Sequence, residues 1–522
     1  MKKQTFTNGV ITVIISQVLV KILGLVYKVI TTNLPGFGDA GNGYYGAAYK
    51  VYVVVLSLSI TGISSAIAKL VSEKVAKGEE AAAHRIFKVA LKLFITIGTI
   101  VTLIIVFASG FIADNILSNS GAQWSLVVLT PSIIFIAISA VFRGYFVGHS
   151  DMKPQNISQI IEQVFNSLFS ILFVYILMGK SSEIMAVGSA IGTTLSTIMN
   201  VVYLVLIYRK NKIKFDKTEI VNERTKTIIK NILRLSLPLA IGSVILTISG
   251  LIDAVTVMRC LQKFMTEDMA NIQLGILTKI DMITAFPLAV TIAFSIVLVP
   301  AIASAVVLKD NATAKLKAQF SIFATILIGL PSTIGIAILA GPILRLLFPN
   351  APDGMLFLQI SAMAIVFSSI GQTTSGILNG LGRVRYQMIA ILIAAIAKLV
   401  LNLILIPVPW IGINGAAISS IINQLIIAVI LLYQAKKHLK LEMNIKKFFI
   451  KPTLASIAMG IATFFTYTIL MRFVGIEPIA TLIALVVAVA TYGVMCLFIK
   501  VLTKEEIEML PFGKKISRFV KL

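Results

Sequence analysis

Long apolar stretches, separated by shorter polar connections, run through almost the whole chain. A stretch of about 20 mainly apolar residues is long enough to cross a hydrocarbon core of roughly 30 Å as an α-helix. Because lipid offers no hydrogen-bond partners, such a stretch must satisfy its own backbone, which favours helices. The pattern predicts an all-α polytopic membrane protein with fourteen transmembrane helices. The predicted segments are residues 7–31, 46–71, 88–112, 123–147, 156–178, 184–208, 232–258, 274–304, 316–340, 355–379, 386–406, 413–435, 449–471 and 478–501.

Positive charge is distributed unevenly among the connections between these segments. If the N-terminus is cytoplasmic, the cytoplasmic connections and termini carry 28 of the 46 Lys and Arg residues, and thirteen lie within the predicted segments, several of them close to a cytoplasmic end. The remaining five, in the outer connections, are Lys180, Arg259, Lys263, Arg345 and Arg472. Membrane proteins gather Lys and Arg in their cytoplasmic loops. The distribution therefore predicts cytoplasmic N- and C-termini and supports an even number of helices.

Composition narrows the class of protein further. Of the residues 57% are hydrophobic and only 13% are charged, whereas soluble domains carry about a quarter charged residues. The mean hydropathy of +0.95 requires lipid as the solvent for much of the surface. A formal charge of +24 would suggest nucleic acid in a soluble protein, but here it agrees with basic loops facing anionic lipid. We therefore expect a lipid bilayer as partner and no nucleic acid.

The chemistry of a metal centre or an enzyme is missing from the sequence. Two cysteines and three histidines are scattered without a ligand spacing, so we expect no metal and no cofactor. These residues are Cys260, Cys496, His84, His149 and His438. A Walker motif and a Ser/His/Asp arrangement are also missing. Lys2 and Lys3 precede the first apolar segment without a small-residue cleavage site behind it, so we expect that helix to remain in the mature protein. These features indicate a transporter and not an enzyme.

A weak internal repeat relates two parts of the chain. Gly144–Gly148 aligns with Gly376–Gly380 at an offset of 232 residues, and Gly46–Lys50 aligns with Gly275–Lys279 at 229. Chance similarity between apolar sequences is the alternative. If the repeat is real, it predicts two pseudo-symmetric six-helix lobes followed by two further helices, an arrangement common in transporters. The predicted division is an N-lobe at 1–208, a cytoplasmic linker at 209–231, a C-lobe at 232–435, two C-terminal helices within 436–502 and a cytoplasmic tail at 503–522.

Lysines at or near membrane depth are the main candidates for substrate binding: Lys21, Lys28, Lys50 and Lys279. A cation at the centre of a membrane helix costs about 2.5–3.5 kcal/mol, so such residues usually face a bundle interior or a watery cavity. Lys21 and Lys28 lie on one stripe of the first helix, and Lys50 and Lys279 occupy matching positions of the repeat. Snorkelling to the interface is the alternative interpretation. A cavity lined by these lysines would bind an anion such as phosphate or pyrophosphate.

Deep acidic residues are fewer than deep lysines. Glu162, Asp253 and Asp281 are candidates for an ion site or a charge pair, and so is Lys398 in the eleventh segment. A structural ion pair and a coupling-ion site both remain open for each acid. Asp281 lies two residues after Lys279, so the two side chains should point to different faces of a helix.

The segment Asn33–Tyr45 is predicted to be the first outer loop. Its dense glycines, which include Gly41 and Gly43, allow unusual backbone angles and suggest a hinge. Asp39 and Asn42 are candidates for contacting a sugar headgroup or for latching an outer gate. An ordinary flexible turn is the alternative.

Two motifs carry a resemblance to a known family. Gly38-Asp39-Ala40-Gly41-Asn42-Gly43-Tyr44-Tyr45-Gly46 is one, and Phe142-Arg143-Gly144-Tyr145-Phe146, which leads to Ile157–Gln163, is the other. Both resemble the polysaccharide-biosynthesis flippases, in the branch that includes stage V sporulation protein B and the MurJ-type lipid II flippases. The resemblance implies an exporter of the MOP superfamily with a cationic cavity between two lobes, working by alternating access. It also implies a groove for the polyprenyl tail within 436–502.

The resemblance further implies that basic residues of helices 1, 2 and 8 take part in function. Lys21, Lys28, Lys50 and Lys279 occupy these regions, where arginine is frequent in the family. Lysine offers a point charge in place of a bidentate fork. The headgroup geometry therefore differs from that of an arginine site.

These features together suggest a flippase in the bacterial cytoplasmic (inner) membrane. Its expected substrate is lipid II, an undecaprenyl-pyrophosphate-linked cell-wall precursor, with cell-wall synthesis machinery as a candidate partner. No cofactor is expected, and membrane potential or a monovalent ion are candidate energy sources. Flippases for another lipid-linked polysaccharide share these features. A multidrug antiporter should prefer buried carboxylates, and a scaffold for wall-synthesis enzymes would not need buried lysines.

Overall fold

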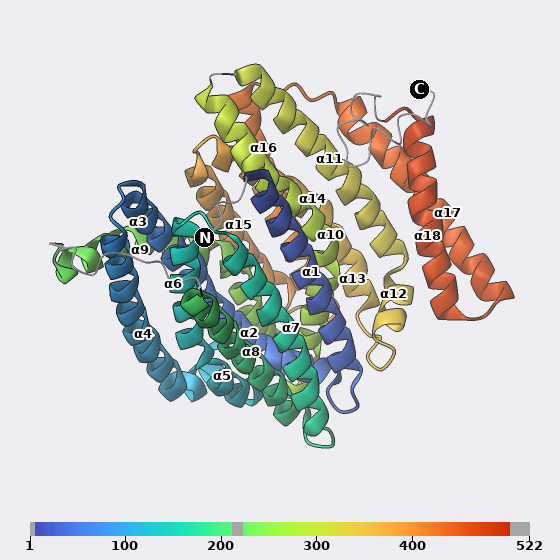
Figure 1. Cartoon of the computed structure of the whole chain (residues 1–522). Helices are drawn as coiled ribbons and strands as arrows, with labels where there is room; N and C mark the ends of the chain where they lie inside the picture. Colours follow the sequence, from blue (N-terminus) through green and yellow to red (C-terminus); the bar gives the residue numbers. More distant parts are fainter. Residues whose placement is uncertain (1–5, 211–222, 309, 502–522) are drawn as a thin grey trace. The chain divides into compact units, whose positions relative to one another are not determined.

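The structure, a computed structural model, describes residues 6–210, 223–308 and 310–501 (Figure 1). Within these ranges the chain is helical and contains no strand, which confirms the predicted all-α class. The predicted C-terminal tail at 503–522 and most of the predicted linker at 209–231 lie outside the described residues. Lys2 and Lys3 lie outside them as well.

The chain packs as two compact units. Unit 1 comprises Met1–Lys279 and Asn402–Ile413, and unit 2 comprises Ile280–Leu401 and Asn414–Leu522. The predicted six-helix lobes have other bounds and stay a prediction.

The helices that begin in unit 1 run from α1 to α10. They are α1 (Phe6–Asn33), α2 (Gly38–Ser57), a π-helix (Leu58–Ile63), α3 (Ser64–Ala76), α4 (Glu80–Phe111), a π-helix (Ile112–Ile116), a 3-10 turn (Ser120–Ala122), α5 (Gln123–Leu129), α6 (Ser132–Gly148), α7 (Lys153–Ile176), α8 (Ser182–Lys210), α9 (Thr225–Leu261) and α10 (Glu267–Val307). Only the first part of α10, up to Lys279, belongs to unit 1.

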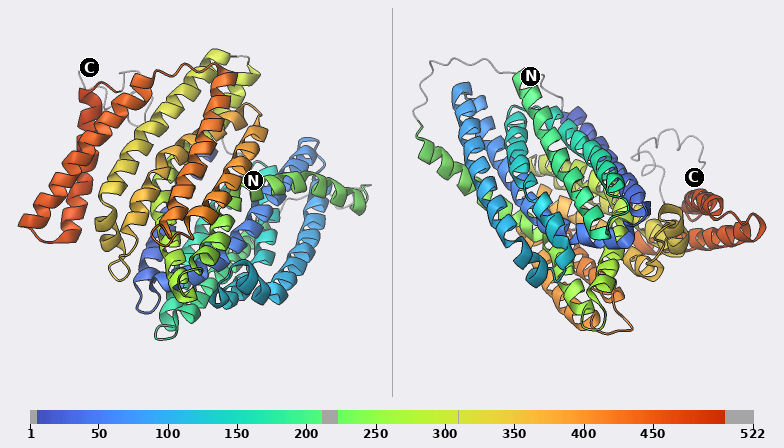
Figure 2. Two further views of the ribbon diagram at one scale, coloured as in Figure 1. Left: turned by 180° about the vertical axis from the view of Figure 1, so that it is seen from behind. Right: turned by 90° about the horizontal axis from the view of Figure 1, so that it is seen from below.

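Unit 2 continues along α10 and holds most of the later helices. These are α11 (Asn311–Ile338), α12 (Ala340–Leu347), α13 (Met355–Ala362), α14 (Ala364–Gly380), α15 (Val384–Leu405), α16 (Asn414–Leu439), a π-helix (Lys446–Ile450), α17 (Lys451–Phe473) and α18 (Glu477–Phe498). The last two run side by side as a hairpin in both views of Figure 2.

Helix lengths and composition agree with a multi-pass membrane protein. In the described residues eleven helices are long and apolar enough to cross a membrane, or up to twelve if a pair bent by 41° counts as one span. That pair joins Ser120–Leu129 to Ser132–Gly148. Each of the fourteen predicted segments overlaps helical residues, while the count of fourteen and the orientation of the termini stay predictions.

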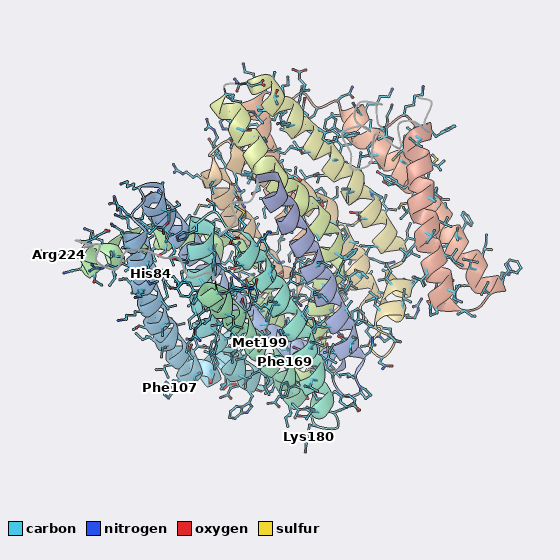
Figure 3. All side chains as sticks on the ribbon, viewed as in Figure 1. His84, Phe107, Phe169, Lys180, Met199 and Arg224 are labelled. Atoms are coloured by element: carbon cyan, nitrogen blue, oxygen red, sulfur yellow. The ribbon has the colours of Figure 1, made fainter. Side chains whose placement is uncertain are left out.

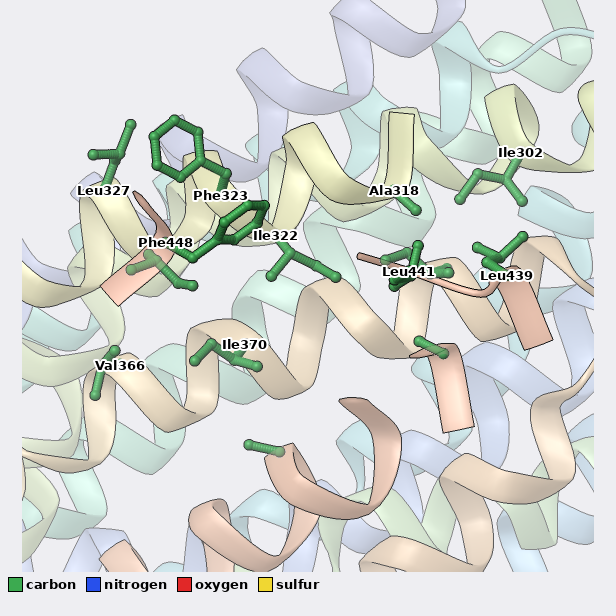
Figure 4. Close-up of a cluster of buried hydrophobic side chains, with 14 of the residues drawn as sticks. Ile302, Ala318, Ile322, Phe323, Leu327, Val366, Ile370, Leu439, Leu441 and Phe448 are labelled. Carbon is green, nitrogen blue, oxygen red and sulfur yellow. The ribbon is translucent and has the colours of Figure 1, made fainter. Parts of the chain in front are cut away.

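The apolar side chains of each unit divide between an interior and a surface. In unit 1 a buried cluster joins α3, α4 and α6 and includes Ile67 and Phe87. In unit 2 a cluster around Phe323, Ile370 and Phe448 joins α11, α14 and the turn before α17 (Figure 4). By contrast Phe107 on α4, labelled in Figure 3, is 85% exposed. An apolar surface of this kind requires lipid around it.

One predicted boundary was wrong. The sequence predicts a loop over Asn33–Tyr45, but α2 begins at Gly38 and contains Asp39, Gly41, Asn42 and Gly43 as buried residues. Within the segment Asn33–Tyr45, positive φ angles occur at Gly36 (86°) and at Gly38 (47°), where α1 turns into α2. Gly43 packs closely against Asn271 of α10, a role that a glycine-rich pattern does not distinguish from a turn.

Candidate functional site

The site is organised by a close crossing of α2 and α10 within unit 1. A Cβ atom on Gly43 would overlap Asn271, and one on Gly275 would overlap the backbone of Asp39. Asn271 also donates its side-chain N–H to the backbone oxygen of Ala40 at 2.9 Å. Glycine is therefore required here because the two backbones lie in contact, as at the small-residue interfaces of other membrane helices.

Lys279 on α10 forms a buried ion pair with Asp39 in the first turn of α2. The Lys279 Nζ lies 2.8 Å from Asp39 Oδ1 and donates a hydrogen bond to Oδ2, also at 2.8 Å. The lysine is 0% exposed and the aspartate 7%. Asp39 lies close to the N-terminus of α2, where the helix dipole favours a negative charge. The pair joins two helices from matching parts of the predicted repeat.

Lys28 on α1 brings a second buried cation to this place. It is 2% exposed, and its Nζ lies 5.5 Å from the centre of the Tyr45 ring, a cation–π geometry. It lies within electrostatic range of both Asp39 and Lys279. No carboxylate in the described part of the chain forms an ion pair with Lys28. The group of Lys28, Lys279 and Asp39, which we call the lysine cluster, thus holds two cations and one anion.

The other two predicted lysines differ from this pair. Lys50 is half-buried on α2. Its side chain packs against Gly250 of α9, where Nζ lies 3.5 Å from the position that a Cβ atom would take. Lys21 is exposed on α1. The structure therefore brings Lys28 and Lys279 together and leaves Lys21 outside the buried group.

Glu162 on α7 is held by two donors. Arg143 of α6 donates from Nη2 to Glu162 Oε2 at 2.9 Å, and Asn200 of α8 donates to the same oxygen at 2.7 Å. The Arg143 Nε donates to Ser158 at 2.9 Å. Of the two interpretations left open by the sequence, the geometry favours a charge pair that joins three helices.

Asp253 on α9 is buried and accepts a hydrogen bond from Asn402 Nδ2 at 3.1 Å. The same Asn402 amide donates to Thr256 at 2.8 Å. In unit 2, Lys398 is buried on α15 and Asp281 is exposed on α10. Lys279 and Asp281 thus lie on different faces of α10, as their spacing predicts.

Polar contacts that the sequence did not reveal surround the lysine cluster. Asn42 donates to Thr32 at 2.9 Å, which joins α2 to α1. Asn119 donates to Asn271 at 2.8 Å, and the four residues of these two hydrogen bonds are all fully buried. Arg143 was also missed as the partner of Glu162, although a lone arginine inside an apolar stretch is a signal for a buried pair.

The start of α10 also holds the segment that follows α4. Glu267 accepts from the backbone N–H of Ser120 at 2.7 Å and from its hydroxyl at 2.6 Å. Tyr44 donates to Asp268 at 3.1 Å. Residues from both predicted halves are therefore tied together at this end of unit 1, the end at which α1 turns into α2.

Comparisons with known proteins show what the chain is similar to. Residues 6–306 match the family described as polysaccharide biosynthesis protein, and residues 238–404 match the family described as MatE. The chain is 25% identical to the uncharacterized membrane protein YabM of Bacillus subtilis, over 100% of this chain and 98% of the relative. It is 24% identical to stage V sporulation protein B of the same organism, over 99% and 100%. A solved structure of the lipid II flippase MurJ, in an inward closed conformation, matches 94% of this chain and 99% of that chain with a TM-score of 0.74 at 18% identity. This last likeness confirms the predicted fold.

Proposed function

The chain belongs to the polysaccharide biosynthesis protein family, and we propose that it is a flippase for a lipid-linked cell-wall precursor. The substrate that we propose is lipid II, an undecaprenyl-pyrophosphate-linked unit, moved from the inner to the outer leaflet by alternating access. A flippase of this kind breaks no bond in its substrate. Its task is to shelter a polar, anionic headgroup from the hydrocarbon while the tail stays in lipid.

The observation that carries the proposal is the net positive charge of the lysine cluster. The Lys28 and Lys279 ammonium groups both lie within electrostatic range of the Asp39 carboxylate, so these three described residues together carry one net positive charge. Burying such a charge is costly unless a partner arrives. A pyrophosphate supplies acceptor oxygens and the missing negative charge in one group. The printed names of a fold neighbour and a relative, a lipid II flippase and a sporulation protein, support a lipid-linked substrate of this chemistry.

We assign the other predicted residues supporting roles. Lys50 and Lys21 attract the headgroup on its way to Lys28 and Lys279. Asp39, Asn42, Gly41 and Gly43 hold α2 against its neighbours, so they act as the gate through packing and hydrogen bonds. The α17–α18 hairpin, whose surface is largely exposed and apolar, is the proposed groove for the polyprenyl tail.

A flippase for another lipid-linked polysaccharide is the second candidate. It is favoured by the full-length relation to stage V sporulation protein B, at a higher identity than that to the solved lipid II flippase. A drug-cation antiporter is less well supported, although residues 238–404 match the MatE family. The lysine cluster has the wrong sign for a cationic drug.

The test is rescue of a bacterium depleted of its own lipid II flippase, with every variant at matched expression in the membrane. We expect rescue by the wild type and loss of rescue by Lys28→Gln and Lys279→Gln. Lys92→Gln is the matched control, because it removes the same charge from an exposed position of α4 outside the site. Rescue by all three variants would refute the lysine site.

A direct flipping assay in proteoliposomes separates the two candidate substrates. The probes are fluorescent lipid II and an undecaprenyl-pyrophosphate carrying a different saccharide. Transport of lipid II supports the first proposal. Transport of the second lipid alone would replace lipid II as the substrate and leave the flippase mechanism in place.

A further inference from the structure

A histidine and a glutamate join two helices at the end of unit 1 away from the lysine cluster. Glu80 is the first residue of α4, and His149 follows the last residue of α6. The His149 Nε2 lies 3.1 Å from Glu80 Oε2, and its Nδ1 lies 2.9 Å from the backbone oxygen of Tyr145. We call this arrangement the His149–Glu80 clasp.

The partners of the imidazole fix its proton content. A backbone carbonyl only accepts, so the Nδ1 of His149 must carry a hydrogen to bond the oxygen of Tyr145. In a neutral ring Nε2 would then present a lone pair to the carboxylate of Glu80, which is repulsive. The contact is attractive when the ring is an imidazolium or when the carboxyl is protonated. Either way, the clasp holds one proton more than a neutral histidine beside a carboxylate.

The clasp is partly shielded from solvent. The His149 side chain is 6% exposed and that of Glu80 is 30% exposed. The ring of Tyr145 packs on His149 with centroids 4.4 Å apart. Shielding strengthens a charge-assisted hydrogen bond relative to one on an open surface. The partial exposure of Glu80 nevertheless leaves a route by which a proton can leave.

The elements packed around the clasp carry further ionisable side chains. On α4, His84 (labelled in Figure 3) stacks on Tyr208 of α8 with centroids 6.2 Å apart and an interplanar angle of 1°. Asp151, just beyond the clasp, accepts the backbone N–H two residues further on at 3.2 Å. The ionisable side chains at this end of the packed elements are His84, Arg85 and Lys88 on α4, Tyr145 on α6, Asp151 and Lys153 at the start of α7, Tyr203, Tyr208, Arg209 and Lys210 on α8, Lys226, Lys230 and Arg234 on α9, and Lys69, Glu73, Lys74, Lys77 and Glu79 on α3 and the α3–α4 turn.

We propose that the His149–Glu80 clasp is a proton-operated latch between the beginning of α4 and the end of α6. With its proton the clasp ties these two helix ends together, and without it the ring and the carboxylate separate. The orientation predicted from the basic loops places this end in the cytoplasm, so the latch reads cytoplasmic pH. The helix that it holds, α6, also carries Arg143, which pairs with Glu162 of α7. The latch does not depend on the proposed substrate.

The first experiment measures the apparent melting temperature of the purified protein between about pH 5.5 and about pH 8.5, the range in which histidine titrates. The clasp stabilises the fold at acidic pH, and this contribution is lost as pH rises and the proton leaves. We expect His149→Gln and Glu80→Gln to lower the melting temperature by roughly 2–4 °C at the acidic end and to match the wild type at the alkaline end. A double variant should lose no more than either single one.

His438→Gln is the matched control, because it makes the same substitution in α16, where the Nε2 has no hydrogen-bond partner among the described residues. It should not reproduce the loss of melting temperature that His149→Gln shows at the acidic end. An unchanged pH dependence in His149→Gln, or an equal change in His438→Gln, would overturn the proposal.

A second measurement covers the case in which the variants fold poorly. The chain contains three histidines, so nitrogen NMR of ¹⁵N-histidine-labelled wild type gives a simple spectrum. Near neutral pH we expect one ring with the signature of a hydrogen on both nitrogens or of a neutral Nδ1–H ring bonded to a protonated acid. Rings that all show the ordinary neutral mixture of tautomers would contradict the latch.

Discussion

The charge balance of the lysine cluster makes a prediction that distinguishes its two ion-pair partners. Asp39→Asn removes the single carboxylate and leaves two buried ammonium groups facing each other. Lys279→Gln leaves Lys28 and Asp39, which carry opposite charges and lie within electrostatic range. The two substitutions are similar in size, but their effects on the buried charge are opposite.

The magnitude follows from the burial of both partners, which are 0% and 7% exposed. Removing one member of a buried ion pair costs about 3–5 kcal/mol, chiefly because the other charge stays buried without its partner. Asp39→Asn should lie near the upper end of this range, since it raises the net charge of the cluster from one to two. Lys279→Gln should lie at the lower end, because Lys28 can neutralise the carboxylate. The double variant restores a single positive charge, so we expect a favourable coupling of about 2–3 kcal/mol.

The assay uses the two cysteines of the protein. Cys260 and Cys496 are both buried and free, so a thiol-reactive dye reports unfolding when heat exposes them. We expect the apparent melting temperature to fall more for Asp39→Asn than for Lys279→Gln. The fall in the double variant should be smaller than the sum of the falls in the two single variants. The two single variants should differ in the direction of their change in pyrophosphate affinity. Asp39→Asn should bind pyrophosphate more tightly than the wild type, and Lys279→Gln should bind it more weakly.

Equal losses in the two single variants, with additive losses in the double variant, would refute the charge argument. Weaker pyrophosphate binding in both single variants would show instead that the pair is purely structural. Both outcomes are measured on the purified protein and need no transport assay.

Two further predictions concern packing and pH. Gly43→Ala should lower the melting temperature and the yield of folded protein, because the new methyl group overlaps Asn271. Gly493→Ala is the control and should leave both unchanged, because its methyl group meets nothing within 4 Å. Equal effects of the two substitutions would refute the close contact of α2 and α10. The hydrogen bond from Lys315, at 2.5 Å, holds the pKa of the Glu442 carboxyl below its usual range. The stabilising contribution of this pair should therefore be present above about pH 4.3 and disappear as pH falls through the lowered pKa of Glu442. It should also be lost in Glu442→Gln and in high salt. If the melting temperature of Glu442→Gln fell with acidic pH just as that of the wild type does, that result would contradict this reasoning.

Much of the fold could be predicted because lipid imposes one simple rule on the sequence. Apolar stretches of sufficient length must be helices, and every predicted segment overlaps helical residues. The start of α2 could not be predicted in the same way. Gly43 lies in the helix where Asn271 of α10 packs directly on it, and a local pattern contains no information about the helix that will lie opposite.

The candidate site could be predicted in part for a similar reason. A buried lysine is costly wherever it lies, so depth alone identified Lys28 and Lys279. Depth does not reveal the direction of a side chain, and Lys21 turned out to be exposed. Nor does it reveal the partner: Asp39 was predicted to lie in a loop, yet it is the carboxylate that pairs with Lys279 240 residues away.

The position of Asp39 bears on how a flippase of the proposed kind could release its substrate. A site built from two buried lysines alone would hold a pyrophosphate strongly, and a carrier that binds too strongly does not turn over. Asp39 contacts Lys279 with both oxygens at 2.8 Å, the arrangement that a phosphate would otherwise adopt. The carboxylate therefore competes with the substrate for the same cation. On the proposed function, arrival of the headgroup would displace Asp39 from Lys279 and return of Asp39 would favour departure, so the ion pair would couple occupancy of the site to the packing of α2 on α10.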